Sequence, residues 1–262
     1  MPRARTYQTE AVIIKKTKLG EADHILTFYT PELGKIQGVA KGVRRPKSKL
    51  SGHLELLTHS MVELAHGRNL DTVIGSQTID SFVPLKCDLE LGACALYATE
   101  LVAQFGAERQ ENRPLFELLL ETMRRLSNCS DQAESRLALR YFELHLLHEA
   151  GYRPQLQCCV VCRRPLTDAA GNFSVSGGGV VCGDCRMTQT FTYPLSVNAL
   201  RTLRSLQDGD CAEVGRMDAD AAVIREMETV LRYYLRYLLD RDIRSAAWLD
   251  TLKRSMPAVA DH

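Results

Sequence analysis

The sequence lacks the long apolar segments of a membrane protein. No run of about 18 apolar residues occurs in its 262 residues, so no membrane-spanning helix is expected. The N-terminus has the basic residues Arg3 and Arg5 without an apolar stretch behind them, so no secretory signal peptide is expected either. Hydrophobic residues make up 45% of the chain and charged residues 25%, which is typical of a folded protein. We therefore expect a cytoplasmic protein that does not contact a membrane.

Recognisable catalytic motifs are also missing. No Walker loop, Gly-x-Gly-x-x-Gly fingerprint or nucleophile–base pair stands out. The triplet Gly177–Gly179 lacks the strand-to-helix context of a phosphate-binding loop. His53-Leu54-Glu55 matches the His-x-Glu of zinc deaminases, but it lies far upstream of the cysteines, and no proline precedes them. We therefore expect no enzymatic activity.

A strong excess of one charge is absent as well, because 33 basic and 32 acidic residues leave a formal net charge of +1. The distribution is uneven. Residues 1–50 hold eleven basic and four acidic side chains, a net charge of +7. Residues 86–150 hold seven basic and eleven acidic side chains, a net charge of −4. This asymmetry indicates a polyanion-binding end and a separate surface for a protein partner.

The residues present predict a multidomain α+β protein. The first 80 residues contain five candidate strands separated by turn residues, at 6–16, 24–30, 35–40, 54–64 and 72–79. Five short strands favour a small closed barrel of the OB type, although strand counting does not exclude an SH3-like barrel. Helical patterns follow over 88–106, 112–128 and 131–150, and helices resume near Ser196.

The change from strand-forming to helix-forming sequence patterns predicts how the chain divides into domains. We expect an OB-fold domain over residues 1–82 and a helical domain over 83–153 and 193–255. A cysteine-containing module over 154–192 would be inserted in the helical domain.

Four of the nine cysteines form two Cys-x-x-Cys pairs, Cys159 with Cys162 and Cys182 with Cys185, with nineteen residues between the pairs. This spacing is typical of two zinc knuckles that close one four-thiolate site. Cys158 is an alternative to Cys159 as a ligand. Four thiolates leave no open coordination position, so we expect one structural Zn²⁺ that stabilises a module too small to fold unaided.

Residues 35–49 hold six basic side chains and no acidic one: Lys35, Lys41, Arg44, Arg45, Lys47 and Lys49. Gly42 and Pro46 predict that most of this segment is a loop after a strand. A charged loop is usually solvated surface, but this one belongs to a barrel type that often binds single strands. We therefore predict that the loop binds phosphates, with arginines gripping them bidentately and lysines acting as point charges.

Aromatic side chains near the basic segment could stack on bases. Tyr7, Phe28 and Tyr29 are the candidates, with core packing as the alternative for Phe28. Nothing in the segment is typical of base-edge readout, so little sequence preference is expected.

Several segments together resemble the RecO family of bacterial recombination mediators. The similar segments are 10–14, 20–27, 30–35, 39–50, 138–144, 151–152, 243–245 and the four cysteines. The block Ala40-Lys41-Gly42-Val43-Arg44-Arg45 is the most specific part, and the resemblance extends over about residues 7–250. It implies an N-terminal OB domain, a helical domain and a zinc module.

The resemblance also implies a function in DNA repair. It implies binding of single- and double-stranded DNA, annealing of complementary strands, and contact with RecR and with the single-strand-binding protein SSB. Together these activities let RecA load onto SSB-coated DNA, in the bacterial cytoplasm and at the nucleoid during repair. The family's basic loop corresponds to the six cations of residues 35–49, and its zinc ligands correspond to the four cysteines.

Two predictions concern protein partners. The acidic, phenylalanine-ending tail of SSB needs an apolar pocket with a basic rim, and Arg140, beside Tyr141 and Leu144, is the candidate rim residue. The alternative for Arg140 is an ordinary surface salt bridge. The alternative for the whole chain is a zinc-ribbon scaffold that binds proteins and has only weak direct affinity for DNA.

Overall fold

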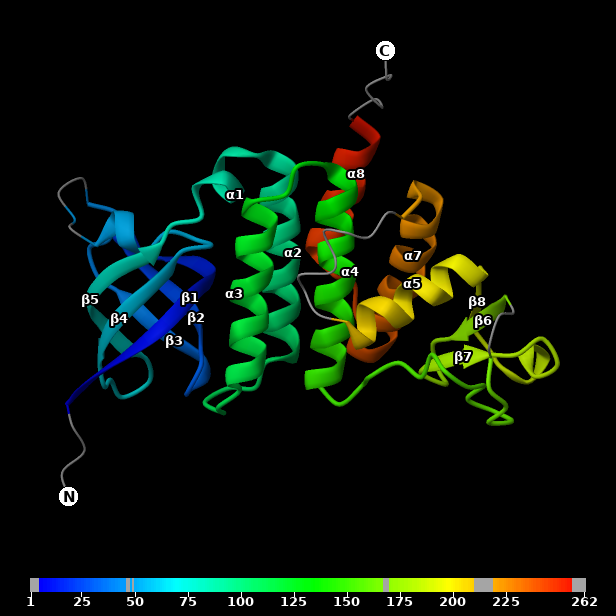
Figure 1. Cartoon of the computed structure of the whole chain (residues 1–262). Coiled ribbons are helices and arrows are strands. Elements are labelled where there is room, and N and C mark those ends of the chain that lie inside the picture. Colours follow the sequence, from blue (N-terminus) through cyan, green and yellow to red (C-terminus); the bar gives the residue numbers. More distant parts are fainter. Residues whose placement is uncertain (1–4, 46–47, 49, 167–169, 210–218, 256–262) are drawn as a thin grey trace, which may run out of the picture. The chain divides into compact units, whose positions relative to one another are not determined.

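The structure, a computed structural model, describes residues 5–45, 48, 50–166, 170–209 and 219–255 (Figure 1). The chain packs into two compact units. Met1–Ser127 and Ser245–His262 form the first, named here the barrel unit, and Asn128–Arg244 form the second, the cysteine unit. The division into domains at residues 82, 153 and 192 stays a prediction, because packing into units does not test where independent domains begin and end.

A closed barrel of five strands begins the barrel unit, as the sequence predicts. Its strands are β1 (Thr6–Leu19), β2 (Asp23–Thr30), β3 (Gly34–Ala40), β4 (His59–Ala65) and β5 (Asp71–Asp80), in the order β1-β2-β3-β5-β4. All pairings are antiparallel except that of β3 with β5, which runs from Gly38 opposite Asp71 to Val39 opposite Thr72. The barrel is therefore mixed and of the OB type.

Alternation of side chains along the strands fills the barrel. Phe28 on β2 lies opposite Ile36 on β3, and both side chains are buried. Gly38 leaves room for them, because a Cβ there would stand 3.0 Å from Leu64 and 3.4 Å from the Phe28 ring. The buried core consists of Ala11, Ile13, Leu26, Phe28, Ile36, Ala40, Val43, Leu54, Val62, Leu64 and Val73.

The fourth strand begins at His59, five residues later than the apolar pattern predicts. Residues Ser51–His53 form a 3₁₀ turn (η1), and Leu57 adopts a left-handed φ of 60°. Backbone bonds between Ile13 and residues 57 and 58 interrupt the β1 register. Leu54 and Leu57 are buried without belonging to a strand, and Leu56 is partly buried against the barrel core.

Four helices complete the described part of the barrel unit: α1 (Val83–Cys87), α2 (Leu89–Phe105), α3 (Arg113–Ser127) and α8 (Arg244–Ser255). Asp88 begins α2 by accepting hydrogen bonds from the N–H groups of residues 90 and 91. Gly106 ends α2 against the buried Tyr29 ring, where a Cβ would come within 2.6 Å. Ser245 joins α8 to α2 by donating its N–H to Glu100 at 2.8 Å. No helix in the described ranges is long and apolar enough to cross a bilayer.

The cysteine unit combines three longer helices with a small sheet. The helices are α4 (Gln132–Glu149), α5 (Val197–Asp208) and α7 (Ala221–Leu239). The sheet consists of β6 (Gly171–Ser174), β7 (Gly179–Val181) and β8 (Thr192–Leu195), in the order β7-β6-β8. Asp131 begins α4 by accepting a hydrogen bond from the Glu134 N–H at 2.8 Å, and the Glu134 carboxylate accepts one from the Ser130 N–H at 3.0 Å.

Hydrogen bonds from α5 and α7 hold the cysteine-containing segment. The Arg204 guanidinium donates to the Leu156 carbonyl at 2.7 Å and also to that of Leu166. The Tyr234 hydroxyl donates to the Tyr152 carbonyl at 3.1 Å, while its ring meets Phe173 edge-on at 5.4 Å. The segment is therefore fixed on two helices of its own unit.

Two left-handed glycines in the barrel turns allow a matched stability test. A Cβ at Gly34 (φ 54°) would stand 2.2 Å from the Gln110 carbonyl oxygen, whereas one at Gly20 (φ 56°) meets nothing within 4 Å. We expect Gly20→Ala to lower the free energy of unfolding by about 1–2 kcal/mol through backbone strain alone. Gly34→Ala should cost clearly more, because the loop before α3 must also move. Urea denaturation measures both, and equal losses would contradict this account of Gly34.

Candidate functional site

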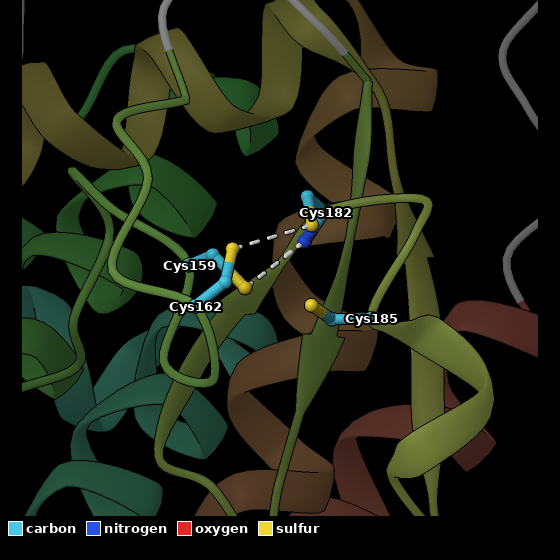
Figure 2. A group of neighbouring side chains, drawn as sticks. All are labelled: Cys159, Cys162, Cys182 and Cys185. Carbon is cyan, nitrogen blue, oxygen red and sulfur yellow. Dashed lines mark hydrogen bonds between the residues drawn. The ribbon is translucent and has the colours of Figure 1, made fainter.

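The four cysteines of the two Cys-x-x-Cys pairs converge on one point (Figure 2). Cys159 and Cys162 come from the loop after α4, and Cys182 and Cys185 from the loop between β7 and the 3₁₀ turn η2 (Arg186–Thr188). All four sulfurs lie within 4.8 Å of one another, and the sulfurs of Cys162 and Cys182 are 3.8 Å apart. The group contains Cys159, and the neighbouring Cys158 lies outside it.

The donor set fits a single soft metal ion. Tetrahedral zinc with bonds of about 2.3 Å to sulfur places its ligands about 3.8 Å apart, close to the spacing of Cys162 and Cys182. The N–H of Cys182 lies 3.5 Å from the Cys159 sulfur and can stabilise a thiolate there. The four sulfurs could therefore bind a metal ion and would leave it no open position for substrate.

The cysteine thiols influence one another's protonation. Burial alone would raise the pKa of Cys159, but backbone N–H groups on both cysteine turns point at its sulfur and lower the pKa to about 6. The pKa of Cys185 is raised to about 12, first by hydrogen bonding to Cys182 and then by burial. The Cys159 thiol therefore loses its proton at a lower pH than the Cys185 thiol. A cation would favour deprotonation of the whole group, so metal affinity should rise with pH.

The loop after β3 presents cations from a fixed backbone. Val43 is buried in the barrel core, and the N–H of Gly42, at φ 63°, donates to the Asp23 carboxylate at 2.7 Å. Lys41, Arg44 and Arg45 are exposed around this anchor. The cations are therefore offered to solvent by a loop whose centre is part of the core.

The β1–β2 turn supports the loop from the other side. The backbone N–H of Arg44 donates to the Ala22 carbonyl at 3.0 Å, and its guanidinium donates to the Gly20 carbonyl at 3.3 Å. Lys18 on β1 lies level with the end of β3, just before the loop. It pairs with His24 on β2, and His24 pairs with Ala40 on β3. The sequence analysis did not consider Lys18, whose position beside the loop depends on the register of the β1–β2 hairpin.

The structure does not bring together all six predicted cations of the basic segment. Lys35 is the second residue of β3 and is about 17 Å from the end of the strand at Ala40 by the strand rise. Its ammonium group is half-buried and donates to the Ala103 carbonyl at 2.8 Å. Lys47 and Lys49 lie outside the described residues. The described cluster therefore consists of Lys41, Arg44 and Arg45, which we name the basic loop.

A cavity of about 1210 Å³ opens elsewhere on the barrel unit. The Tyr7 ring borders it and stacks on His66, with ring centres 4.9 Å apart. Phe28 and Tyr29 are fully buried, so they do not offer stacking faces. Tyr7 is the member of the three predicted rings that borders open space.

The buried Asp71 carboxylate organises this cavity. It accepts hydrogen bonds from the Tyr7 hydroxyl at 2.7 Å, from Arg109 at 3.3 Å and from the Gly67 N–H at 3.1 Å. Burial alone would raise the pKa of Asp71, but these hydrogen bonds and the positive charge of Arg109 lower it below its usual value. Burial and the same carboxylate raise the pKa of Tyr7, so its hydroxyl remains a donor.

The residues predicted to meet the SSB tail are buried in the cysteine unit. Arg140 is 3% exposed and pairs with Glu143 at 2.7 Å and Glu228 at 3.7 Å. Tyr141 and Leu144 are also buried. A peptide would reach the three residues only after neighbouring side chains moved, and a contact with SSB stays a prediction. The buried pair also differs from the surface salt bridge considered as the alternative.

Family models match both parts of the chain. Residues 3–82 match the model described as Recombination protein O N terminal, and residues 87–247 match Recombination protein O C terminal. The chain is 45% identical over 255 residues to the DNA repair protein RecO of Dehalococcoides mccartyi strain 195, covering 97% of this chain and 99% of that protein. It is also similar to the proteins of the same name from Roseiflexus sp. (43% identical; 97% and 88% covered) and Symbiobacterium thermophilum (32%; 94% and 98%).

The Asp71 network predicts an acid-sensitive contribution to stability. A carboxyl group whose pKa is lowered in the folded state stabilises the fold above its unfolded pKa, and this stabilisation is lost as the pH falls through the folded pKa. Asp71→Asn removes that titration. We expect the free energy of unfolding to fall less steeply between pH 5 and pH 3 in the variant than in the unmodified chain, by urea denaturation at each pH. Parallel pH profiles would contradict the role of Asp71.

Proposed function

The chain belongs to the RecO family of non-enzymatic DNA repair and recombination mediators, and on this premise we propose that its barrel binds DNA through the basic loop. Both single- and double-stranded DNA are ligands, because phosphates are common to them. The observation that carries the proposal is the exposure of Lys41, Arg44 and Arg45 around the buried Val43 anchor. A fixed backbone presents the three charges with less conformational freedom to lose on binding.

Phosphate contact explains how such a surface anneals strands. Each arginine can grip one phosphate bidentately, and the lysine supplies a point charge. Cations that neutralise the phosphates of two strands lower the repulsion between them and allow complementary bases to pair. No base edge needs to be read, so the reaction is expected to proceed with any complementary sequence.

We further propose that the four-cysteine group binds one Zn²⁺ with a structural role. The bound ion would supply a link between the loop that carries Cys159 and the loop that carries Cys182. The matching sulfur spacing supports this proposal. The link would stabilise the small sheet and leave DNA chemistry to other residues.

Partner proteins complete the proposed activity. With RecR, the chain would help load RecA onto single strands coated by SSB, in the bacterial cytoplasm. We keep Arg140, Tyr141 and Leu144 as the proposed contact for the SSB tail, in a state in which their surroundings open. We also keep residues 1–82, 83–153 with 193–255, and 154–192 as the proposed functional domains.

The salt dependence of DNA binding tests the basic loop. Each neutralised phosphate on a single strand contributes about −0.7 to the slope of log affinity against log salt. We expect the Arg44→Ala/Arg45→Ala double variant to bind more weakly, with a slope flatter by about 1.4. Fluorescence anisotropy of a labelled oligonucleotide at four salt concentrations measures both.

A charge-matched control separates the loop from net charge. Arg201→Ala/Arg225→Ala removes two exposed arginines of the cysteine unit and should leave the slope unchanged. An unchanged slope in the Arg44/Arg45 variant would remove the loop from the proposal. Weak, salt-insensitive binding by the unmodified chain would favour the protein-binding scaffold.

Metal analysis tests the proposed zinc site. We expect one Zn²⁺ per chain, lost in Cys182→Ser but retained in Cys158→Ser, because Cys158 lies outside the sulfur group. Removing the ion with a chelator should lower the melting temperature, since binding energy at a structural site is folding energy. Elemental analysis and thermal unfolding provide the readouts, and equal zinc content in the two variants would overturn the ligand assignment.

A further inference from the structure

An aromatic groove lies between α7 and the small sheet of the cysteine unit. Its volume is about 590 Å³, within the range of small-ligand sites. The residues that matter here are Phe191, Tyr193, Tyr233, Arg236, Tyr237 and Arg241. The basic loop, the cavity at Tyr7 and the four sulfurs share no residue with it.

Two tyrosines of α7, Tyr233 and Tyr237, are not buried in the core of the cysteine unit. Tyr233, Tyr237 and Asp240 follow at spacings of four and three residues, which places them on one side of the helix. The buried side of α7 is centred on Met227, Leu231 and Tyr234, and the two tyrosines lie at its edge, next to the buried Val230. Tyr233 is 38% exposed and Tyr237 is 51% exposed, so two tyrosine rings remain partly in water.

The groove already contains a stacked pair of rings. Tyr193 on β8 and Tyr233 on α7 lie parallel, with an interplanar angle of 12° and ring centres 4.2 Å apart. Phe191 precedes β8 at a left-handed φ of 55° and is 69% exposed. A left-handed backbone is unfavourable for a bulky residue, and such strain is concentrated at functional positions. The wall of the groove thus holds an exposed ring in a strained conformation.

The charges at the groove balance. Arg236 pairs with Asp242 at 2.9 Å, and Arg241 lines the groove together with Asp240. Two positive and two negative side chains give no net attraction for phosphates, so a ligand in this groove would be held by its rings and not by its charge. A flat, uncharged aromatic ligand with polar edges fits better, because rings and guanidinium planes offer stacking faces while the polar groups offer hydrogen bonds.

We propose that this groove is a base-stacking subsite for single-stranded nucleic acid, which receives unpaired bases on the rings of Tyr233, Tyr237 and Phe191. The inference rests on the proposed function, because its ligand is the single-stranded DNA that the barrel is proposed to bind. The two sites differ in what they recognise. The basic loop takes phosphates of any strand, whereas the groove takes base faces that a duplex keeps covered.

Abasic DNA provides the test. A labelled 15-nucleotide oligothymidylate and an abasic oligonucleotide of equal length carry the same phosphates, and only the first carries bases. Base–aromatic stacking is worth about 5- to 150-fold in affinity for each base. We expect Tyr233→Leu and Tyr237→Ala each to weaken oligothymidylate binding about tenfold, to leave abasic binding unchanged and to leave the salt slope unchanged. Tyr233→Phe should retain full affinity, because the ring remains.

Two controls keep the result specific. Tyr152→Leu removes another exposed tyrosine of the same unit, outside the groove, and should not change either affinity. The Arg44/Arg45 variant should lose affinity for both oligonucleotides. Full oligothymidylate affinity in the two groove variants would overturn the subsite and leave the proposed function standing, and equal losses on both oligonucleotides would also overturn it. Failure of the proposed function appears separately, as an Arg44/Arg45 variant that behaves like the unmodified chain.

A crosslinking measurement gives a second readout that does not depend on affinity. An oligonucleotide with 5-iodouracil forms photochemical crosslinks to aromatic side chains that stack on the base. We expect crosslinked peptides that contain Phe191, Tyr233 or Tyr237, identified by mass spectrometry of the full chain. Crosslinks confined to peptides of the barrel unit would overturn the proposal.

Discussion

The convergence of four sulfurs is the constraint on which the cysteine unit depends. The segment between α4 and α5 contributes only short strands, of three or four residues each, and such strands are weak without further support. The two cysteine turns meet beside this sheet, which carries Tyr193 to its place against Tyr233. The cysteine turns thus support the sheet from one side, while the contacts of Tyr234 with Tyr152 and Phe173 attach it to α7.

A different constraint organises the barrel unit. Val43 inserts into the barrel core in the middle of the loop that carries Lys41, Arg44 and Arg45. The charges beside it cannot follow it inward, because a buried cation without a partner is very costly. Burial of Val43 thus forces Lys41, Arg44 and Arg45 outward, and hydrophobic packing determines where these three exposed cations lie.

Local pattern predicted much of this molecule, and long-range packing explains what it did not predict. Strand alternation and the cysteine spacing are local properties, so the barrel and the four-sulfur group could be read from the sequence. The role of Lys35 could not, because its partner, the Ala103 carbonyl, lies 68 residues away. The burial of Arg140 likewise depends on Glu228 from another helix. The apolar spacing along α7 places Tyr234 on the buried side, but the sequence does not indicate that Tyr233 stacks on Tyr193, because that contact depends on where the sheet lies.

Separate recognition of phosphates and bases has a consequence for annealing. The phosphates of a strand remain accessible after it pairs, so contacts at the basic loop persist through the reaction. Base faces do not remain accessible, because pairing and stacking bury them in the duplex. A protein with both kinds of site would therefore lose the stacking contribution on annealing, while the higher charge density of the duplex strengthens its phosphate contacts. The balance of these two opposing effects would decide whether such a protein stays on the annealed product or releases it.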